Sequence, residues 1–532
     1  MKRYLLRISA LWVRGLILAL LSVSLVALFT EYAYAQVVRF ARTYGGTGSE
    51  WAYSVQQTSD GGYIVAGYTE SFGAGSNDFL LIKTDANGNI IWAKTYGGTS
   101  GDWALPIQQT SEGGYIVAGW TRSFGAGNDD ILLIKTDANG NIIWAKTYGG
   151  TGSDMVYSFQ RTYDGGYILV GGTRSFGAGS LDAFLVKTDA FGNLQWAKTY
   201  GGGSNDEAYS VQQTSDGGYI LVGGTYSFGA GNEDVFLIKT DANGNIIWAK
   251  TYGGTSGDWA FRVQQTSDGG YILVGATASF GAGSSDIFLI KTDANGNIQW
   301  AKTYGGTSGD YAYTVQQTSD GGYIVAGWTR SFGAGYSDVI LIKTDANGNI
   351  QWAKTYGGTS GDYAYTVQQT SDGGYIVPAF TGSFGAGSSD IFLIKTDANG
   401  DIGSCSIVRN VTPTVNTVLP TVNTPSFSIS SVSPIVNTVS PTVTSPALSV
   451  SAPCFLNISE SCQPVSGLIT PYKGGIKVRV SGGFEVKVYN ISGGVVKSIK
   501  GTNEVKLELS RGVYFVEVVS GGKVIREKVV VR

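Results

Sequence analysis

The sequence contains no histidine, and only three of its 532 residues are cysteines. Histidine is the commonest general base and metal ligand in proteins, so its absence removes most hydrolase and zinc mechanisms and leaves chemistry that needs only carboxylates. Charged residues are also scarce, at 14% of the chain. The net charge is −3 overall, +3 in residues 1–35 and +7 in residues 466–532, so the body between them carries −13. An acidic body argues against nucleic acid as a partner, because phosphates need a basic surface.

Glycine, tyrosine and tryptophan are plentiful, at 78, 31 and 12 residues, as is typical of turn-rich β proteins. A segment of 52 residues recurs seven times without an insertion. Its TYGG motif begins at residues 43, 95, 147, 199, 251, 303 and 355, and its SFGAG motif keeps the same step. A fixed period of this size indicates a repeat architecture.

Each repeat has the pattern of four β-strands. In the first repeat these are AYSVQQT, YIVAGYT, FLLIKT and IIWAKT, joined by SDGG, SFGAGSND and DANGN. Asp-Gly-Gly and Asn-Gly favour hairpin turns because they tolerate positive φ. The continuously apolar runs YIVAG and FLLI indicate strands that are buried on both faces. A four-stranded sheet packed between two copies of itself is a propeller blade.

The two ends of the repeat array predict that the ring is closed. The seventh repeat lacks the IIWAKT strand, whereas VVRFARTYGG near the N-terminus aligns with NIIWAKTYGG and places Phe40 at the tryptophan position. We therefore predict an all-β protein with a closed seven-bladed β-propeller over residues 36–404. Residues 37–42 are expected to form the outermost strand of its last blade.

The DANGNIIW stretch resembles the docking motif of quinoprotein-type propellers, whose tryptophan packs between neighbouring blades. The resemblance implies the fold, and no cofactor is predicted from it. It assigns a packing role to six tryptophans, namely Trp92, Trp144, Trp196, Trp248, Trp300 and Trp352. Asp85, Asn87 and Asn89 also have the spacing of calcium ligands, but Phe191 replaces the middle asparagine in the third repeat. We therefore favour a hairpin turn and predict no metal site.

A candidate binding site follows from positions that differ between the repeats, because the scaffold does not dictate them. The residue that opens the first strand and the residue that ends the second are mostly aromatic, and both lie at the rim of the TYGG and SFGAG loops. An acid directly precedes the opening position. The predicted ligand-binding residues are Trp51, Trp103, Trp120, Trp259, Tyr311, Trp328, Tyr363, Asp102, Asp258 and Asp310. The alternative is that the aromatics fill gaps between blades and the acids cap loop amides.

Residues 405–465 are rich in Thr, Val, Ser and Pro and nearly uncharged, which predicts an extended linker, although the Val-Thr alternation leaves weak strand pairing open. Cys405, Cys454 and Cys462 allow at most one internal disulfide, and the sequence does not choose the pair.

Residues 466–532 contain short strand patterns and are expected to form a small β-sandwich. At VYNISGGVVKSI and RGVYFVEVVSGGKVIREKVVVR they resemble the C-terminal sorting domain of type IX secretion substrates. The Tyr-Pro-Asn-Pro opening usual in that family is replaced by ITPYKGG. The resemblance implies contact with the secretion machinery, followed by cleavage of the domain or its use as an anchor at the outer-membrane surface. The alternative is a generic surface-binding β-sandwich.

Residues 1–35 have a basic start, an apolar run and an Ala33-Tyr34-Ala35 ending, which predict a cleaved signal peptide. We expect an extracellular or cell-surface protein without catalytic residues that binds a glycan or a peptide. The alternatives are a carboxylate-dependent glycan-active enzyme and a passive structural surface protein.

Overall fold

The computed structural model describes residues 38–403 and 405–423, and then residues 428–432, 435–438, 442–444, 449–456, 469–472, 475–489, 495–509, 512–520 and 523–531. The chain divides into two compact units between Phe455 and Leu456. The predicted signal peptide lies outside the described residues. In the described part of the chain, no helix is long and apolar enough to cross a membrane.

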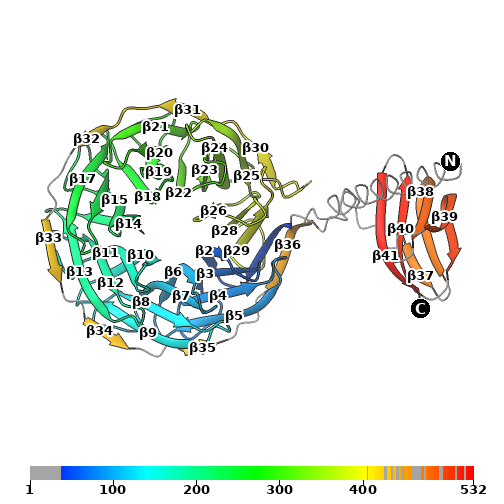
Figure 1. The fold of residues 1–532 in the computed structure, drawn as a ribbon, viewed down its shortest axis with the longest axis horizontal. Coiled ribbons are helices and arrows are strands. Elements are labelled where there is room, and N and C mark those ends of the chain that lie inside the picture. Colours follow the sequence, from blue (N-terminus) through cyan, green and yellow to red (C-terminus); the bar gives the residue numbers. More distant parts are fainter. Residues whose placement is uncertain are drawn as a thin grey trace, which may run out of the picture. The chain divides into compact units, whose positions relative to one another are not determined.

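The first unit is a seven-bladed β-propeller, as predicted (Figure 1). Each blade is an antiparallel sheet, and in blades 1 to 6 the strands follow chain order from the central axis outward. Blade 1 contains β2 (Glu50–Gln57), β3 (Tyr63–Thr69), β4 (Asp78–Thr84) and β5 (Ile90–Gly97). Blade 2 contains β6 (Asp102–Gln109), β7 (Tyr115–Thr121), β8 (Asp130–Thr136) and β9 (Ile142–Gly149). Blade 3 contains β10 (Asp154–Arg161), β11 (Tyr167–Thr173), β12 (Asp182–Thr188) and β13 (Leu194–Gly201).

The remaining blades repeat this order. Blade 4 contains β14 (Asp206–Gln213), β15 (Tyr219–Thr225), β16 (Asp234–Thr240) and β17 (Ile246–Gly253). Blade 5 contains β18 (Asp258–Gln265), β19 (Tyr271–Thr277), β20 (Asp286–Thr292) and β21 (Ile298–Gly305). Blade 6 contains β22 (Asp310–Gln317), β23 (Tyr323–Thr329), β24 (Asp338–Thr344) and β25 (Ile350–Tyr356). Blade 7 contains β26 (Asp362–Ala364), β27 (Gln368–Gln369), β28 (Tyr375–Thr381), β29 (Asp390–Thr396) and β1 (Arg39–Gly45).

The middle strands of each blade carry the core. Every residue of β3 and of β4 is buried, as the continuously apolar runs predict. The innermost strand contains a register shift between Ala52 and Ser54, and the shift recurs in other blades. Such a bulge re-aims side chains, and both Tyr53 and Ser54 line the central channel as a result.

The docking tryptophans pack between blades, as their motif predicts. Trp92 of β5 meets Tyr115 of blade 2 edge to face at 5.8 Å between ring centroids. Phe40 takes this place between blades 7 and 1, where it contacts Tyr63 at 6.1 Å. The TYGG tyrosine adds a hydrogen bond between blades, because the Tyr96 hydroxyl donates to the carbonyl of Gly140 at 2.7 Å.

A ring of glutamines joins the innermost strands. The Oε1 atom of Gln56 accepts the backbone N–H of Gln109 in the next blade at 2.5 Å. The same bond recurs at all seven blade junctions, including the bond from the Gln57 N–H to Gln368 that joins blade 1 to blade 7. We call this ring the glutamine collar, and its members are Gln56, Gln108, Gln160, Gln212, Gln264, Gln316 and Gln368. It satisfies backbone donors at the free inner edge of each sheet.

Strand β1 closes the ring by pairing with β29, from Phe40 opposite Lys395 to Tyr44 opposite Ile391. The prediction that the N-terminal strand completes the last blade is confirmed. The strand is not the outermost one, however, because β36 (Ser449–Leu456) pairs with its other edge.

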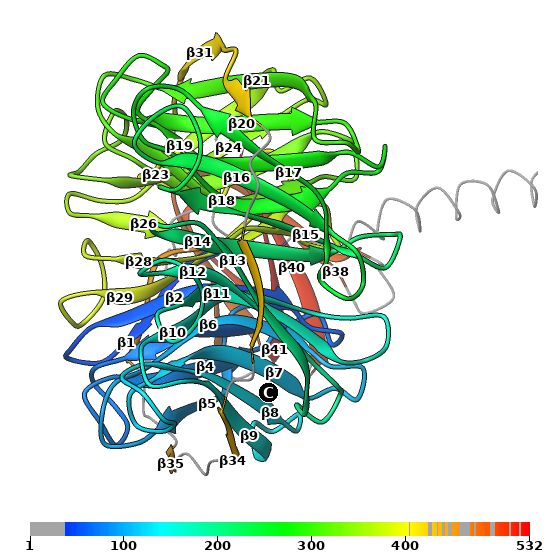
Figure 2. The same ribbon diagram turned by 90° about the vertical axis from the view of Figure 1, so that its left-hand side faces the viewer.

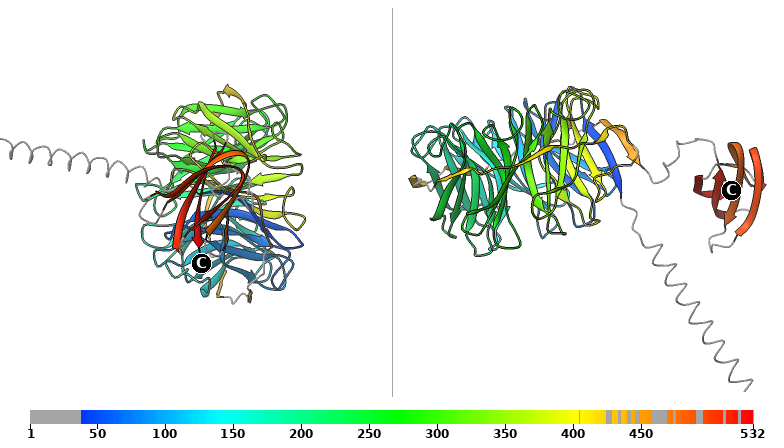
Figure 3. Two further views of the ribbon diagram at one scale, coloured as in Figure 1. Left: turned by 90° about the vertical axis from the view of Figure 1, so that its right-hand side faces the viewer. Right: turned by 90° about the horizontal axis from the view of Figure 1, so that it is seen from above.

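The described residues between 408 and 456 differ from the extended linker that their composition predicts and show the strand pairing that the Val-Thr alternation left open. They form a belt that adds an outer fifth strand to every blade and passes around the ring in reverse order, from blade 6 to blade 1 and then to blade 7 (Figures 1 to 3). Its strands before β36 are β30 (Val408–Asn410), β31 (Thr414–Thr417), β32 (Thr421–Asn423), β33 (Ser428–Val432), β34 (Ile435–Thr438) and β35 (Thr442–Thr444).

The belt has a period of seven residues, since its last six strands begin at residues 414, 421, 428, 435, 442 and 449. A proline directly precedes four of these strands, at Pro413, Pro420, Pro434 and Pro441. Proline suits the first position of an edge strand because it has no N–H to pair. Between strands, Val411 and Val418 donate their N–H groups to the carbonyls of Ala353 and Ala301, and their side chains pack against the apolar clusters between blades.

The second unit is also built of strands. β38 (Gly475–Tyr489) pairs with β39 (Val495–Glu508) along its length, with β37 (Ile469–Tyr472) at its start and with β40 (Gly512–Ser520) at its end. β41 (Lys523–Val531) pairs with β40. Val486 and Val488 are buried and alternate with the more exposed Glu485 and Lys487, as expected for a sheet with one covered face. The β-sandwich stays a prediction.

Candidate functional site

The loop rim of the propeller is built on one buried acid per blade. The Asp102 carboxylate accepts the N–H of Gly98 at 2.8 Å and the Ser123 hydroxyl at 2.7 Å, and it also accepts the Thr121 hydroxyl. These donors belong to the TYGG loop and to the start of the SFGAG loop. Burial raises the pKa of Asp102 more than these hydrogen bonds lower it.

This geometry corrects part of the predicted site. Asp102, Asp258 and Asp310 are 0% exposed, and Asp258 and Asp310 accept the equivalent loop hydrogen bonds in blades 5 and 6. Their oxygens are occupied by donors of the loops, so we assign the three acids to loop anchoring and remove them from the candidate site. Their constancy across the repeats already pointed to this packing role.

A second buried acid approaches each loop-anchoring acid from the third strand of the preceding blade. Asp78 accepts the N–H groups of Ala74 and Gly75 through Oδ2, both at 3.0 Å, while its buried Oδ1 has no hydrogen-bond partner. A Cβ atom added to Gly97 would lie 1.9 Å from Asp78 Oδ1 and 2.8 Å from Asp102 Oδ2. The first glycine of TYGG is therefore required by the close approach of two carboxyl groups.

Asparagine at position 78 is expected to stabilise the folded protein at pH 8. Burial raises the pKa of Asp78, and the charge of Asp102 adds to this. The folded state therefore favours the protonated Asp78 carboxyl. The stability that this carboxyl contributes is fully present below the pKa of an unfolded aspartate, about 3.9, and is lost as the pH rises through the raised pKa of the folded state. In Asp78→Asn the amide oxygen keeps both loop N–H groups, and the NH₂ group can donate to Asp102. We expect a gain of about 1 kcal/mol in unfolding free energy at pH 8, shrinking toward pH 4, measured by denaturation.

The matched control for this experiment is Asp102→Asn. That change leaves one of its three donors without an acceptor and is expected to destabilise the fold at both pH values. A loss of stability in Asp78→Asn at pH 8 as large as that of the control would contradict the paired-acid account.

The predicted aromatic residues meet on the rim and form one continuous arc. The opening residue and the end of the second strand face each other in register, as Trp51 does with Tyr68 and Trp103 with Trp120. Ring contacts then continue from blade to blade, with 4.0 Å between the centroids of Trp51 and Phe380. In order of contact, the arc consists of Trp120, Trp103, Tyr68, Trp51, Phe380, Tyr363, Trp328, Tyr311 and Trp259.

The arc contains all seven aromatic residues that the sequence predicted for the site, and it adds Tyr68 and Phe380. Tyr68 and Phe380 are buried, and the seven predicted residues are each partly exposed. Two arginines flank the arc: Arg122 lies 5.1 Å from the Trp103 ring, and Arg330 lies 5.2 Å from the Trp328 ring. The arc therefore presents apolar ring surface flanked by two arginines, of which Arg122 is paired with Asp129 at 2.7 Å.

Blades 3 and 4 interrupt the arc with a polar gap. Met155 and Glu207 hold the opening positions there, and Gly172 and Gly224 hold the facing positions. The Glu207 carboxylate accepts the Tyr157 hydroxyl at 2.7 Å and the Tyr209 hydroxyl at 3.0 Å. Beside it, the Trp259 indole donates to Glu233 at 2.6 Å. Burial raises the pKa of Glu233, and the charge of Glu207 raises it further.

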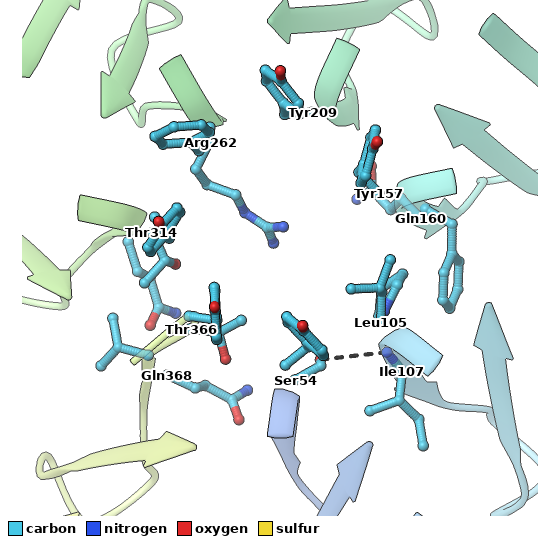
Figure 4. Close-up of a pocket in the computed structure, with 18 of the residues that line it drawn as sticks. Ser54, Leu105, Ile107, Tyr157, Gln160, Tyr209, Arg262, Thr314, Thr366 and Gln368 are labelled. Atoms are coloured by element: carbon cyan, nitrogen blue, oxygen red, sulfur yellow. Dashed lines mark hydrogen bonds between the residues drawn. The ribbon is translucent and has the colours of Figure 1, made fainter. Parts of the chain in front are cut away.

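Below the rim the innermost strands surround a cavity of about 600 Å³ in the central channel (Figure 4). Its upper tier is aromatic in six blades and contains Tyr53, Tyr157, Tyr209, Phe261, Tyr313 and Tyr365, with Leu105 in blade 2. The glutamine collar lines its lower part. Arg262 extends into the cavity from β18. Comparison of the repeats contained the signal for it, since the other six blades carry Ser, Thr or Pro at this position.

The opposite rim carries the SDGG and DANGN turns together. Lys83, which is buried, donates to Asp60 of the SDGG turn and to the carbonyl of Thr84 that precedes DANGN. Asp85 accepts the N–H groups of Asn87 and Asn89 at 2.9 and 2.8 Å through Oδ1, and its Oδ2 accepts the Asn89 amide. The Asp85 oxygens therefore close the turn itself, as the hairpin interpretation predicts.

Comparison with known families agrees with this organisation. Residues 470–532 match the secretion system C-terminal sorting domain, and residues 58–90 match a β-propeller domain of unknown function, DUF5122. The sorting-domain match implies that the protein is exported, interacts with a secretion machinery and reaches the cell surface or the medium. The region matched by the sorting domain begins within β37 and contains β38 to β41 of the second unit.

Similarity to individual proteins is weak. The regulatory protein FlaEY of Caulobacter vibrioides is 28% identical over 141 residues, which are 22% of this chain and 15% of the relative. A crystal structure of a eukaryotic initiation factor covers 68% of this chain and 99% of its own, with 7% identity and a TM-score of 0.32. A hypothetical protein from Leishmania major covers 47% of this chain and 86% of its own, with 12% identity and a TM-score of 0.23.

Proposed function

We propose that this protein is an exported, non-catalytic β-propeller that binds a glycan or a peptide on its TYGG/SFGAG rim, while the C-terminal domain directs its secretion or surface attachment. The observation that carries the proposal is the arc of nine contacting rings on a rim of loops. Loops on a rigid scaffold are the usual place for binding residues, and partly exposed rings next to arginines suit the flat faces of sugars or the side chains of peptides.

The asymmetry of the arc supports a ligand-binding role over a packing role alone. Packing holds equivalent positions to equivalent residues, as it does for the docking tryptophans and for the buried acids. The opening position instead varies from tryptophan to methionine to glutamate within one ring. Its residues nevertheless include five aromatics. Relaxed constraint would more often leave small polar residues at exposed positions.

Alanine at Trp51, Trp103 and Trp259 together is expected to weaken ligand binding at least ten-fold, since each lost ring contact is worth about 1 kcal/mol or more. The secreted protein is first screened on a glycan and peptide array, and affinities for each hit are then measured by calorimetry. The control variant carries alanine at Ile91, Ile143 and Ile247, which are each 58% exposed and lie outside the arc. It should bind as the unchanged protein does.

Three outcomes would contradict this proposal. Absence of any ligand on the array would favour a passive structural protein. Loss of binding only when Asp85 or Asp241 is changed would move the site to the opposite rim and revive the calcium interpretation. Turnover of a glycan that is abolished by Glu207→Gln would favour the carboxylate-dependent enzyme, with Glu207 and Glu233 in place of the buried acids.

A further inference from the structure

Arg262 is the one charged side chain among the described residues that line the central cavity. It lies on β18, and its side chain reaches toward the middle of the channel, away from the strand (Figure 4). The side chain is exposed to the channel. No carboxylate of the described residues forms an ion pair with it. Arginine stays protonated in proteins, so the cavity holds an uncompensated positive charge.

The scaffold does not require this arginine. The equivalent residues are Ser54, Pro106, Ser158, Ser210, Thr314 and Thr366. Where the residue is serine it can serve the fold, since the Ser54 hydroxyl accepts the N–H of Ile107 and the Ser210 hydroxyl accepts the N–H of Val263 in the next blade. Arginine has no acceptor and cannot make that bond. Arg262 thus places a cation at a position where two other blades have a hydrogen bond between blades.

The position of Arg262 relates it to the aromatic arc. Trp259 of the arc, Arg262 and Gln264 of the glutamine collar follow one another along β18, from the loop rim inward. A strand rises about 3.3 Å per residue, so the Cα atom of Arg262 lies at most about 10 Å along the strand from that of Trp259. A ligand that enters from the rim therefore meets the rings first and the cation next. The walls of the cavity offer tyrosine hydroxyls on the rim side of Arg262 and the glutamine collar on its inner side.

We infer that the central cavity binds the anionic group of a charged sugar, a carboxylate or a sulfate, with Arg262 as its counter-ion. This inference rests on the proposed function and narrows its ligand to an acidic glycan. The planar guanidinium matches both anions through paired N–H donors. A protein-lined channel concentrates the field of a single charge. The neutral polar lining suits sugar hydroxyls, and the cavity volume lies within the range of small-molecule sites.

The test compares Arg262→Ser with the unchanged secreted protein. Serine occupies this position in three other blades, so the variant should fold and melt like the parent. The probes are an oligogalacturonate, a sulfated oligosaccharide, a neutral oligosaccharide and an oligoglutamate peptide, each titrated by calorimetry at two salt concentrations. We expect Arg262→Ser to lose at least about ten-fold in affinity for one of the anionic sugars and most of its salt dependence. Affinity for a neutral sugar should not change. Arg262→Lys should keep part of the affinity.

The probes also distinguish failure of the anion-binding inference from failure of the proposed ligand-binding function. Equal affinity of the parent and Arg262→Ser for both anionic sugars would overturn the inference, and neutral sugars that still bind through the arc would leave the proposed function standing. Preference for the oligoglutamate peptide, lost in Arg262→Ser, would overturn the assignment to a sugar. If no probe binds and the array of glycans and peptides is also empty, both proposals fail.

Discussion

Removal of residues 36–45 is expected to unfold the propeller or to lower its melting temperature by tens of degrees. The deletion takes away β1, with Phe40, Ala41 and Tyr44 fully buried. It thereby opens the edge of β29 and leaves β36 without a partner. Loss of one buried phenylalanine side chain costs about 3–5 kcal/mol, and domains are stable by only about 5–15 kcal/mol. Calorimetry of the secreted chain measures the effect.

The control for this deletion is Phe40→Trp, which gives blade 7 the docking residue of the other six blades. The Phe40 site has the same neighbours as those of Trp92 and its counterparts, including a glycine of the next blade's DANGN turn. We therefore expect the variant to melt within a few degrees of the parent. A deletion variant that melts like the parent would show that the ring does not depend on closure by β1.

The sequence predicted the propeller because its signals are local and repeated. The constant 52-residue step, the hairpin turns and the missing last strand together determine the number of blades and the role of Phe40. The repeats also allow positions to be compared within one chain. That comparison found the arc, and applied consistently it would have assigned Asp102, Asp258 and Asp310 to the scaffold and singled out Arg262.

The belt was beyond the reach of the same reasoning. Its strands are three to eight residues long, contain mostly Thr, Val, Asn and Ser, and are interrupted by prolines, which is also the composition of a linker. Its pairing partners are remote, since Thr442 pairs with Gly97 and Thr414 with Gly305. The seven-residue step from residue 414 to residue 449 was the available signal. That step can be interpreted as a series of strands only once the ring is known, because each strand pairs with the free outer edge of one blade.

Truncation after Ser404 is expected to make the propeller aggregate and to lower its melting temperature. The belt covers the outer edge of every blade, and exposed sheet edges pair readily with other chains. Its loss also uncovers the apolar gaps between blades against which Cys405, Val411 and Val418 pack. Light scattering and calorimetry measure the two effects. Truncation after Val465 keeps all three cysteines and removes strands β37 to β41 of the second unit, and it should leave both unchanged. Equal melting of the two truncated chains would contradict a stabilising role of the belt.

Reduction of the Cys405 disulfide provides an independent test of the belt without truncation. Cys405 is disulfide-bonded, and the chain offers only Cys454, in β36, and Cys462 as partners. Both follow Cys405 by a full circuit of the ring, so either pairing converts the belt into a covalent hoop around the propeller. A closed loop of about 50 residues stabilises by about 4 kcal/mol in the chain-entropy model. Reductant should therefore lower the melting temperature of the parent and have no further effect on Cys405→Ser. A parent whose melting temperature is insensitive to reductant would show that strand pairing alone holds the belt in place.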